Sequence, residues 1–82
     1  IKAIWAIKSG DEARRFLRDL MTEKEIKEFS KRLQAAEMLT NKTPYSEIER
    51  KTGLSSTTVA RVAKWLKGKQ GGYKIIISRL HH

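Results

Sequence analysis

Residues 45–66 read YSEIERKTGLSSTTVARVAKWL and predict two short helices that are joined by a tight turn. Gly53 is expected to end the first helix, because glycine adopts a positive φ at little cost. Ser55 is expected to cap the second helix, which then runs from Ser56 to about Lys67. Four apolar residues have the spacing expected of side chains that pack between the two helices and fix their crossing angle. They are Ile48, Leu54, Val59 and Val62. This pattern is typical of a helix-turn-helix, which presents its second helix to the major groove of DNA.

The positive charge of the chain is concentrated in its C-terminal half. The formal net charge is +9, and Glu49 is the last carboxylate in the sequence. The cations that follow it are Arg50, Lys51, Arg61, Lys64, Lys67, Lys69, Lys74 and Arg79. An excess of positive charge around the second helix favours a polyanionic partner. Motif and charge together predict binding to double-stranded DNA.

The side chains of the second helix divide by their expected reach. Ser56, Thr57 and Ala60 are candidates for base edges, because hydroxyls exchange hydrogen bonds and a methyl group packs on thymine. Lys64 and Lys67 are expected to meet phosphates, which position a protein without specifying sequence. The predicted DNA-binding set is Ser55, Ser56, Thr57, Ala60, Arg61, Lys64 and Lys67. The alternatives are an ordinary helical hairpin, hydroxyls that only cap the helix, and lysines that form a solvated face.

Length and composition predict a single all-helical domain. The chain has 82 residues, of which 39% are hydrophobic, so the core of a monomer would be marginal. It has no cysteine, which excludes disulfides and thiolate metal sites and fits a cytoplasmic location. No apolar run approaches the roughly 18 residues of a membrane span, and no signal-peptide pattern is visible. His81 and His82 are expected to be the remnant of a tag rather than metal ligands.

The first 40 residues predict helices with broad apolar faces. Residues 1–8 have a helix-compatible pattern, and residues 11–21 carry an apolar face after the break at Ser9-Gly10. Thr22 and Glu25 form a capping box at the start of a long helix that reaches about Thr40. The expected core face of this helix is Ile26, Phe29, Leu33 and Ala36, with Met38 or Leu39 near its end. Such faces on a small chain favour packing against a second copy.

Two connecting segments flank the predicted motif. Thr43 is expected to cap the helix that starts at Pro44, because proline is favoured at the first helical position. Residues 68–82 form a tail that begins with glycines. Within this tail, residues 73–80 (YKIIISRL) have strand propensity but no evident partner strand. We expect either a short helix or an extended segment there.

Three stretches resemble the Trp repressor superfamily, most closely its YerC/YecD-type branch. They are AIKSGDEARRFLRDLMTEKEI, KRLQAAEMLTNKTPYSEIERKTGLSSTTVARVAKWLK and GGYKI, and they span nearly the whole chain. The resemblance implies an intertwined all-α homodimer, with dimerisation helices in residues 1–40 and the helix-turn-helix in residues 44–67. It also implies a transcriptional regulator that acts as a repressor and binds a palindromic operator. The half-sites would lie about one helical turn, ~34 Å, apart.

The founding member of this superfamily binds L-tryptophan as a corepressor. By resemblance, the residues that match its pocket are Thr22, Arg32, Thr58 and Arg61. Val62 and Trp65 depart from the pattern, because tryptophan-binding members have glycine and serine at these positions. The larger side chains would fill or reshape the cavity, so the sequence disfavours tryptophan as a cofactor. An ion pair with Glu28 is the alternative role of Arg32.

Other function classes are less well supported by the sequence. An enzyme is not expected, because the chain has no cysteine, its only histidines are terminal, and its carboxylates lie at exposed or capping positions. No metal site is predicted. The alternatives that remain open are a helical module that binds an acidic protein and a protein that binds nucleic acid without sequence specificity.

Overall fold

The computed structural model describes residues 1–81, and these residues form six helices. In chain order the helices are α1 (Lys2–Trp5), α2 (Gly10–Leu20), α3 (Glu23–Thr40), α4 (Tyr45–Thr52), α5 (Ser56–Leu66) and α6 (Gly72–Leu80). The predicted all-α fold class is therefore confirmed. Among residues 1–81, no helix combines the length and the apolar character that a membrane span requires.

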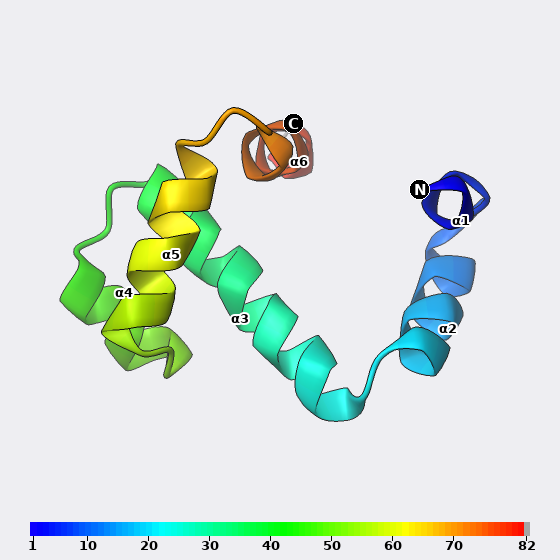
Figure 1. Cartoon of the computed structure of the whole chain (residues 1–82), viewed down its shortest axis with the longest axis horizontal. Coiled ribbons are helices and arrows are strands. Elements are labelled where there is room, and N and C mark those ends of the chain that lie inside the picture. The colour runs from blue at the N-terminus through cyan, green and yellow to red at the C-terminus, as the bar shows by residue number, and fades with distance from the viewer. Residues whose placement is uncertain (82) are drawn as a thin grey trace.

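The long helix α3 separates the structure into two parts. One end of α3 meets α4, α5 and α6, whereas α1 and α2 stand apart at the other end (Figure 1). Among the helices that pack against one another, α2 packs only against α3. We refer to α1 and α2, residues 2–20, as the N-terminal arm. This arm lacks the helical neighbours that would bury its apolar face within one chain.

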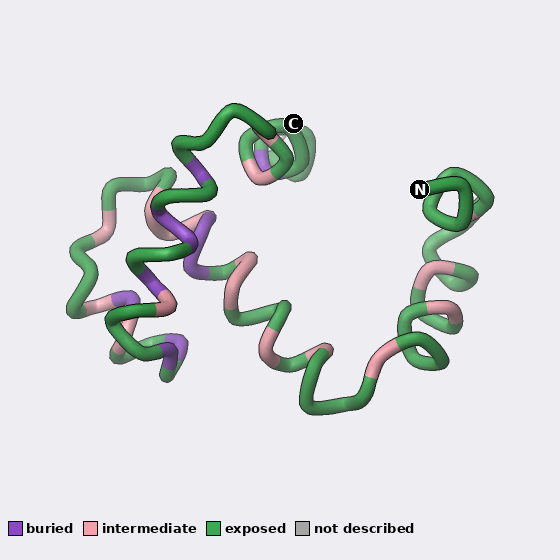
Figure 2. Tube along the Cα trace, in the orientation of Figure 1, coloured by how far each residue is buried: buried purple, intermediate pink, exposed green. Residues whose placement is uncertain are grey.

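The core lies where the C-terminal half of α3 meets α4, α5 and α6 (Figure 2). Its buried residues are Ala35, Ala36, Ile48, Leu54, Val59, Val62 and Ile77. The two alanines of α3 are fully buried, and their small side chains let the other helices approach closely. The four apolar residues that were predicted to hold the crossing of α4 and α5 all belong to this core, as expected from their spacing.

The predicted core face of α3 is only partly correct. Ala36 is buried, but Ile26 and Leu33 are half-buried and Phe29 is 41% exposed. The reason is that α4, α5 and α6 cover only the C-terminal half of α3, as the position of the buried segments in Figure 2 shows. The N-terminal half keeps its apolar pattern without a covering element in the same chain.

The capping predictions have mixed outcomes. The capping box of α3 is confirmed: the Thr22 hydroxyl accepts from the Glu25 N–H (3.1 Å), and the Glu25 carboxylate accepts from the Thr22 N–H (2.9 Å). The prediction that Thr43 caps the next helix is wrong. Pro44 is the N-cap of α4, and the Thr43 N–H instead donates to the carbonyl of Met38 (3.0 Å) to close α3.

At both ends of the chain, the secondary structure differs from what the local sequence pattern alone suggests. The helix expected within residues 1–8 is limited to Lys2–Trp5. Residues 73–80, for which two conformations were open, lie within α6. Ile77 in α6 is 4% exposed and packs on the core, so tertiary burial overrides the strand propensity of the isoleucines.

Candidate nucleic-acid interface

The turn between α4 and α5 is fixed by three hydrogen bonds. The buried Thr52 hydroxyl donates to the carbonyl of Ile48 (2.7 Å) and accepts from the N–H of Leu54 (3.2 Å). Gly53 has φ 76°, and its N–H donates to the carbonyl of Glu49 (2.8 Å). The glycine was predicted at this turn, whereas the role of Thr52 was missed. A threonine directly before the turn glycine was the available signal, since short hydroxyl side chains bond to nearby backbone groups.

The first turn of α5 is organised by two hydroxyl groups. Ser55 is the N-cap, as predicted, and its oxygen accepts from the N–H of Thr58 (3.2 Å). The hydroxyls of Ser55 and Thr58 are also hydrogen-bonded to each other (3.0 Å). Both side chains therefore take part in starting the helix, which was the alternative role considered for them.

The structure places most of the predicted DNA-binding side chains on one exposed face of α5. All members of the set are exposed: Ser55 at the N-cap, then Ser56, Thr57, Ala60, Arg61 and Lys64 on α5, and Lys67 at the C-cap. The opposite face carries Val59, Val62, Ala63 and Leu66, which are buried. Burial of this face in the core therefore fixes the rotation of α5 about its axis. On the exposed face, the small polar residues lie one to three helical turns from the cations. We call the exposed set the α5 face.

The positive charge of the α5 face is not neutralised by carboxylates of the described residues. On α4, Glu47 lies 3.5 Å from Arg50 and 3.6 Å from Lys51, so those two cations are partly compensated. Within residues 1–81, no ion pair involves Arg61, Lys64 or Lys67. These cations are exposed to solvent and available to a polyanion.

The residues assigned by resemblance to a tryptophan pocket do not line one cavity in the single chain. Thr22 is exposed and takes part in the capping box of α3, while Val62 is fully buried in the core. Arg32 lies over the ring of Phe29 (5.4 Å to the centroid) and 3.7 Å from Glu28. In the single chain Arg32 therefore pairs with Glu28, which is the alternative role considered for it.

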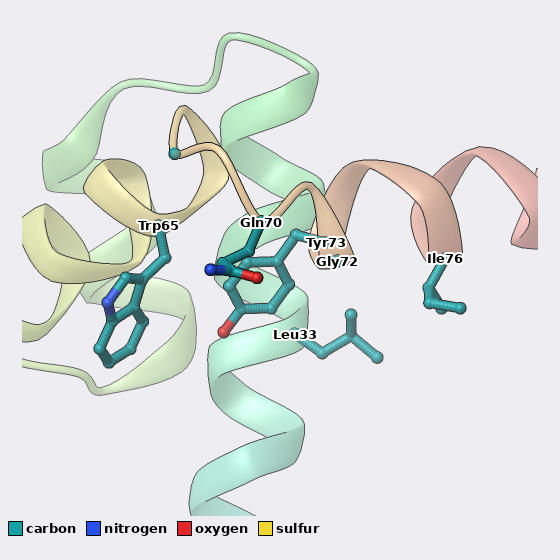
Figure 3. A pocket seen from close by; sticks show the side chains of 7 residues that line it. Leu33, Trp65, Gln70, Gly72, Tyr73 and Ile76 are labelled. Atoms are coloured by element: carbon teal, nitrogen blue, oxygen red, sulfur yellow. The ribbon is translucent and has the colours of Figure 1, made fainter. Parts of the chain in front are cut away.

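Trp65 lines a hollow of its own between α3, α5 and α6. The hollow has a volume of about 500 Å³, and its walls include Leu33, Gln70, Tyr73 and Ile76 (Figure 3). Arg32 lies instead at a separate, smaller hollow beside Phe29. Sequence reasoning did not identify Tyr73 and Gln70 as cavity residues, although the GGY motif of residues 71–73 marks this segment.

Comparison with known proteins identifies the family. The family model described as Trp repressor protein matches residues 1–81. The chain belongs to the Trp repressor family. The uncharacterized protein YerC of Bacillus subtilis is 35% identical over 78 residues, which cover 95% of this chain and 75% of that protein.

A solved structure supports the assignment to the Trp repressor family. It is described as a TrpR-like protein from Eubacterium eligens and has a TM-score of 0.86 and 38% sequence identity to this chain. The match covers 98% of this chain and 82% of the other. The resemblance predicted from the three sequence stretches is therefore confirmed, and the helical arrangement is that of a TrpR-like protein.

Proposed function

We propose that this Trp repressor family member is a homodimeric transcriptional regulator that binds a palindromic double-stranded DNA operator, where it acts as a repressor. The observation that carries the proposal is the α5 face. It combines small polar side chains near the start of an exposed helix with Arg61, Lys64 and Lys67 further along. This is the arrangement in which a second helix contacts base edges and neighbouring phosphates. Such a protein would act in the cytoplasm.

The N-terminal arm supports the homodimer. Trp5 is 85% exposed, Leu20 is 63% exposed and Phe29 on α3 is 41% exposed. Large apolar side chains that stay exposed on several neighbouring helices favour an interaction surface. A second copy would supply the missing neighbours of α2 and α3, which accounts for an arm that packs against little of its own chain. A two-fold dimer would also present two α5 faces to successive major grooves.

The proposed regulator does not require L-tryptophan. Val62 is fully buried against the core, and the Trp65 indole occupies the surface of α5 beside the hollow of Figure 3. Both side chains are larger than the glycine and serine of tryptophan-binding members. Binding to the operator is therefore expected with and without the amino acid.

The test is selection from a randomised duplex library at two salt concentrations, with and without L-tryptophan. We expect a palindrome to be enriched in both cases. Enrichment only with tryptophan would overturn the assignment of Val62 and Trp65. Salt-sensitive binding without an enriched sequence would replace the proposal with non-specific nucleic-acid binding, and absence of DNA binding would favour a protein-interaction module.

A further inference from the structure

A groove beside the C-terminal end of α5 is lined by three lysines from three segments. Two adjoining hollows of about 580 and 480 Å³ share Thr40, Leu66 and Lys67. The first continues along α6 past Lys74 and Ile77, and the second continues along the α3–α4 loop past Lys42. We call the combined surface the lysine groove, defined by Lys42, Leu66, Lys67, Lys74 and Ile77.

The groove combines an apolar floor with a cationic rim. Leu66 is 9% exposed and Ile77 is 4% exposed, so their side chains form part of the packed interior. No carboxylate lines either hollow. In the described part of the chain, none of the three lysines takes part in an ion pair. A ligand therefore meets apolar contacts at the base and ammonium donors at the edge.

Two hydroxyl groups of the groove do not compete with the lysines as donors. The Thr40 hydroxyl donates to the carbonyl of Ala36 (2.9 Å), and the Ser78 hydroxyl donates to the carbonyl of Ile75 (2.8 Å). Both hydroxyl protons are used within their own helices. The side-chain donors that remain are the lysine ammonium groups, the amide of Asn41 at the first hollow and the hydroxyls of Thr43 and Tyr45 at the second. The His81 ring, which also lines the first hollow, lies 3.2 Å from the Glu37 carboxylate. Such a donor set selects an anion.

Lys42 is held in an unfavourable backbone conformation at this groove. Its φ is 61°, in the left-handed region that glycine occupies at lower cost. This conformation belongs to the turn that ends α3, and it leaves Lys42 at the second hollow as the third cation of the groove.

We propose that the lysine groove binds a small organic anion with an apolar body, of the aromatic carboxylate class. The carboxylate would lie between lysine ammonium groups, and the hydrocarbon part would cover Leu66 and Ile77. Inorganic phosphate would satisfy the rim but leave the apolar floor in water. A neutral aromatic molecule would cover the floor but leave the lysines without a counter-charge.

The position of Lys67 links the groove to DNA binding, a consequence that rests on the proposed function. Lys67 belongs to both the lysine groove and the α5 face. A bound anion would neutralise positive charge at the edge of the DNA-binding surface. The two ligands should therefore bind with negative coupling, and the anion should weaken operator affinity.

The first experiment uses the ¹⁵N-labelled full chain without DNA, titrated with 2-naphthoate at constant ionic strength. We expect amide shifts at Thr40, Lys67, Lys74 and Ile77, with binding at least about tenfold tighter than that of neutral 2-naphthamide. Lys74→Gln should weaken naphthoate binding several-fold. Lys24→Gln, a change on the exposed surface of α3, is the matched control and should leave it unchanged.

Three results of this titration would overturn the proposal. Equal affinity for 2-naphthamide would remove the role of the lysines, and equal affinity for inorganic phosphate would remove the role of the apolar floor. Shifts confined to residues outside the groove, or no shifts, would show that the ligand site is wrong. Because DNA is absent, these outcomes are independent of the proposed function.

The second experiment measures operator affinity with sodium 2-naphthoate and with sodium acetate at the same ionic strength. Naphthoate is expected to lower the operator affinity of the wild type several-fold. The operator affinity of the Lys74→Gln variant should fall much less. Naphthoate binding in the groove with unchanged operator affinity would refute the coupling through Lys67. Lack of any operator would refute the proposed function, while the titration would still decide the groove.

Discussion

At the scale of single residues, Lys42 is the non-glycine residue with a positive φ among residues 1–81. It ends α3 in a Schellman arrangement, in which the Lys42 N–H donates to the carbonyl of Leu39 and the Thr43 N–H donates to that of Met38, both at 3.0 Å. The backbone bonds are satisfied, so the cost of this position lies in the side chain of lysine. A Cβ atom in this conformation crowds the neighbouring carbonyl oxygen.

Lys42→Gly is therefore expected to stabilise the protein. Relief of the left-handed strain should raise the free energy of unfolding by about 1 kcal/mol. Urea unfolding followed by circular dichroism measures this difference. Lys31→Gly, which changes an exposed lysine within α3, is the matched control and should lower stability by about 1 kcal/mol because glycine is a poor helix former. A loss of stability in Lys42→Gly would contradict the assignment of strain.

At the scale of elements, the start of α3 depends on an ionised carboxylate. The backbone N–H of Thr22, together with its hydroxyl, holds the pKa of Glu25 below its ordinary value. A carboxyl with a lower pKa in the folded state contributes stability above its unfolded pKa, and this contribution is lost as the pH falls through the folded pKa. Acid should therefore weaken the first turn of α3.

Glu25→Gln should remove the part of the acid destabilisation that comes from this cap. We expect the free energy of unfolding of the wild type to fall more steeply between neutral and acidic pH than that of the variant. Urea unfolding at a series of pH values measures both slopes. Glu23→Gln, in the same first turn but outside the capping box, should retain the wild-type slope. Identical slopes in all three proteins would remove Glu25 from this role.

The second element-scale prediction concerns the α5 face. Thr57→Ala should relax specificity at one operator position and cost about 1–3 kcal/mol there. Lys64→Ala should weaken binding to all sequences similarly and reduce the slope of log affinity against log salt by about 1. Binding to the selected operator and its single-base variants at several salt concentrations measures both effects. Unchanged affinities in correctly folded variants would exclude α5 as the DNA-reading helix.

At the scale of the whole molecule, the uncovered apolar side chains of the N-terminal arm predict the assembly state. Leu20→Asp should disrupt the homodimer, because the aspartate would have to be buried at the interface without a partner charge. The dissociation constant should increase at least about tenfold, as measured by sedimentation. Lys51→Asp, which adds an acid on the exposed surface of α4, is the control and should sediment as a dimer. A monomeric wild type would contradict the homodimer directly.

The local predictions succeeded where a pattern acts within a few residues. The Thr22–Glu25 capping box, the Ser55 cap and the Gly53 turn each depend on neighbours in the chain, and each was confirmed. The apolar spacing of α4 and α5 also identified their buried faces, because helical periodicity defines a face without knowledge of its partner. Thr43 was misassigned because α3 ends and α4 begins near it, and a capping pattern does not show which of the two helices its backbone N–H bonds to.

The sequence by itself determined the helices α2 to α5, the buried side of α5 and the family, since these follow from periodicity, caps and residue identity. Only the tertiary structure decided which apolar faces are covered within one chain. It showed that Phe29 is exposed whereas Ile77 is buried, although both are large and apolar. It also brought Lys42, Lys67 and Lys74 to one groove. The physical reason is that burial and cavity shape arise from contacts between segments distant in the chain, which local patterns do not encode.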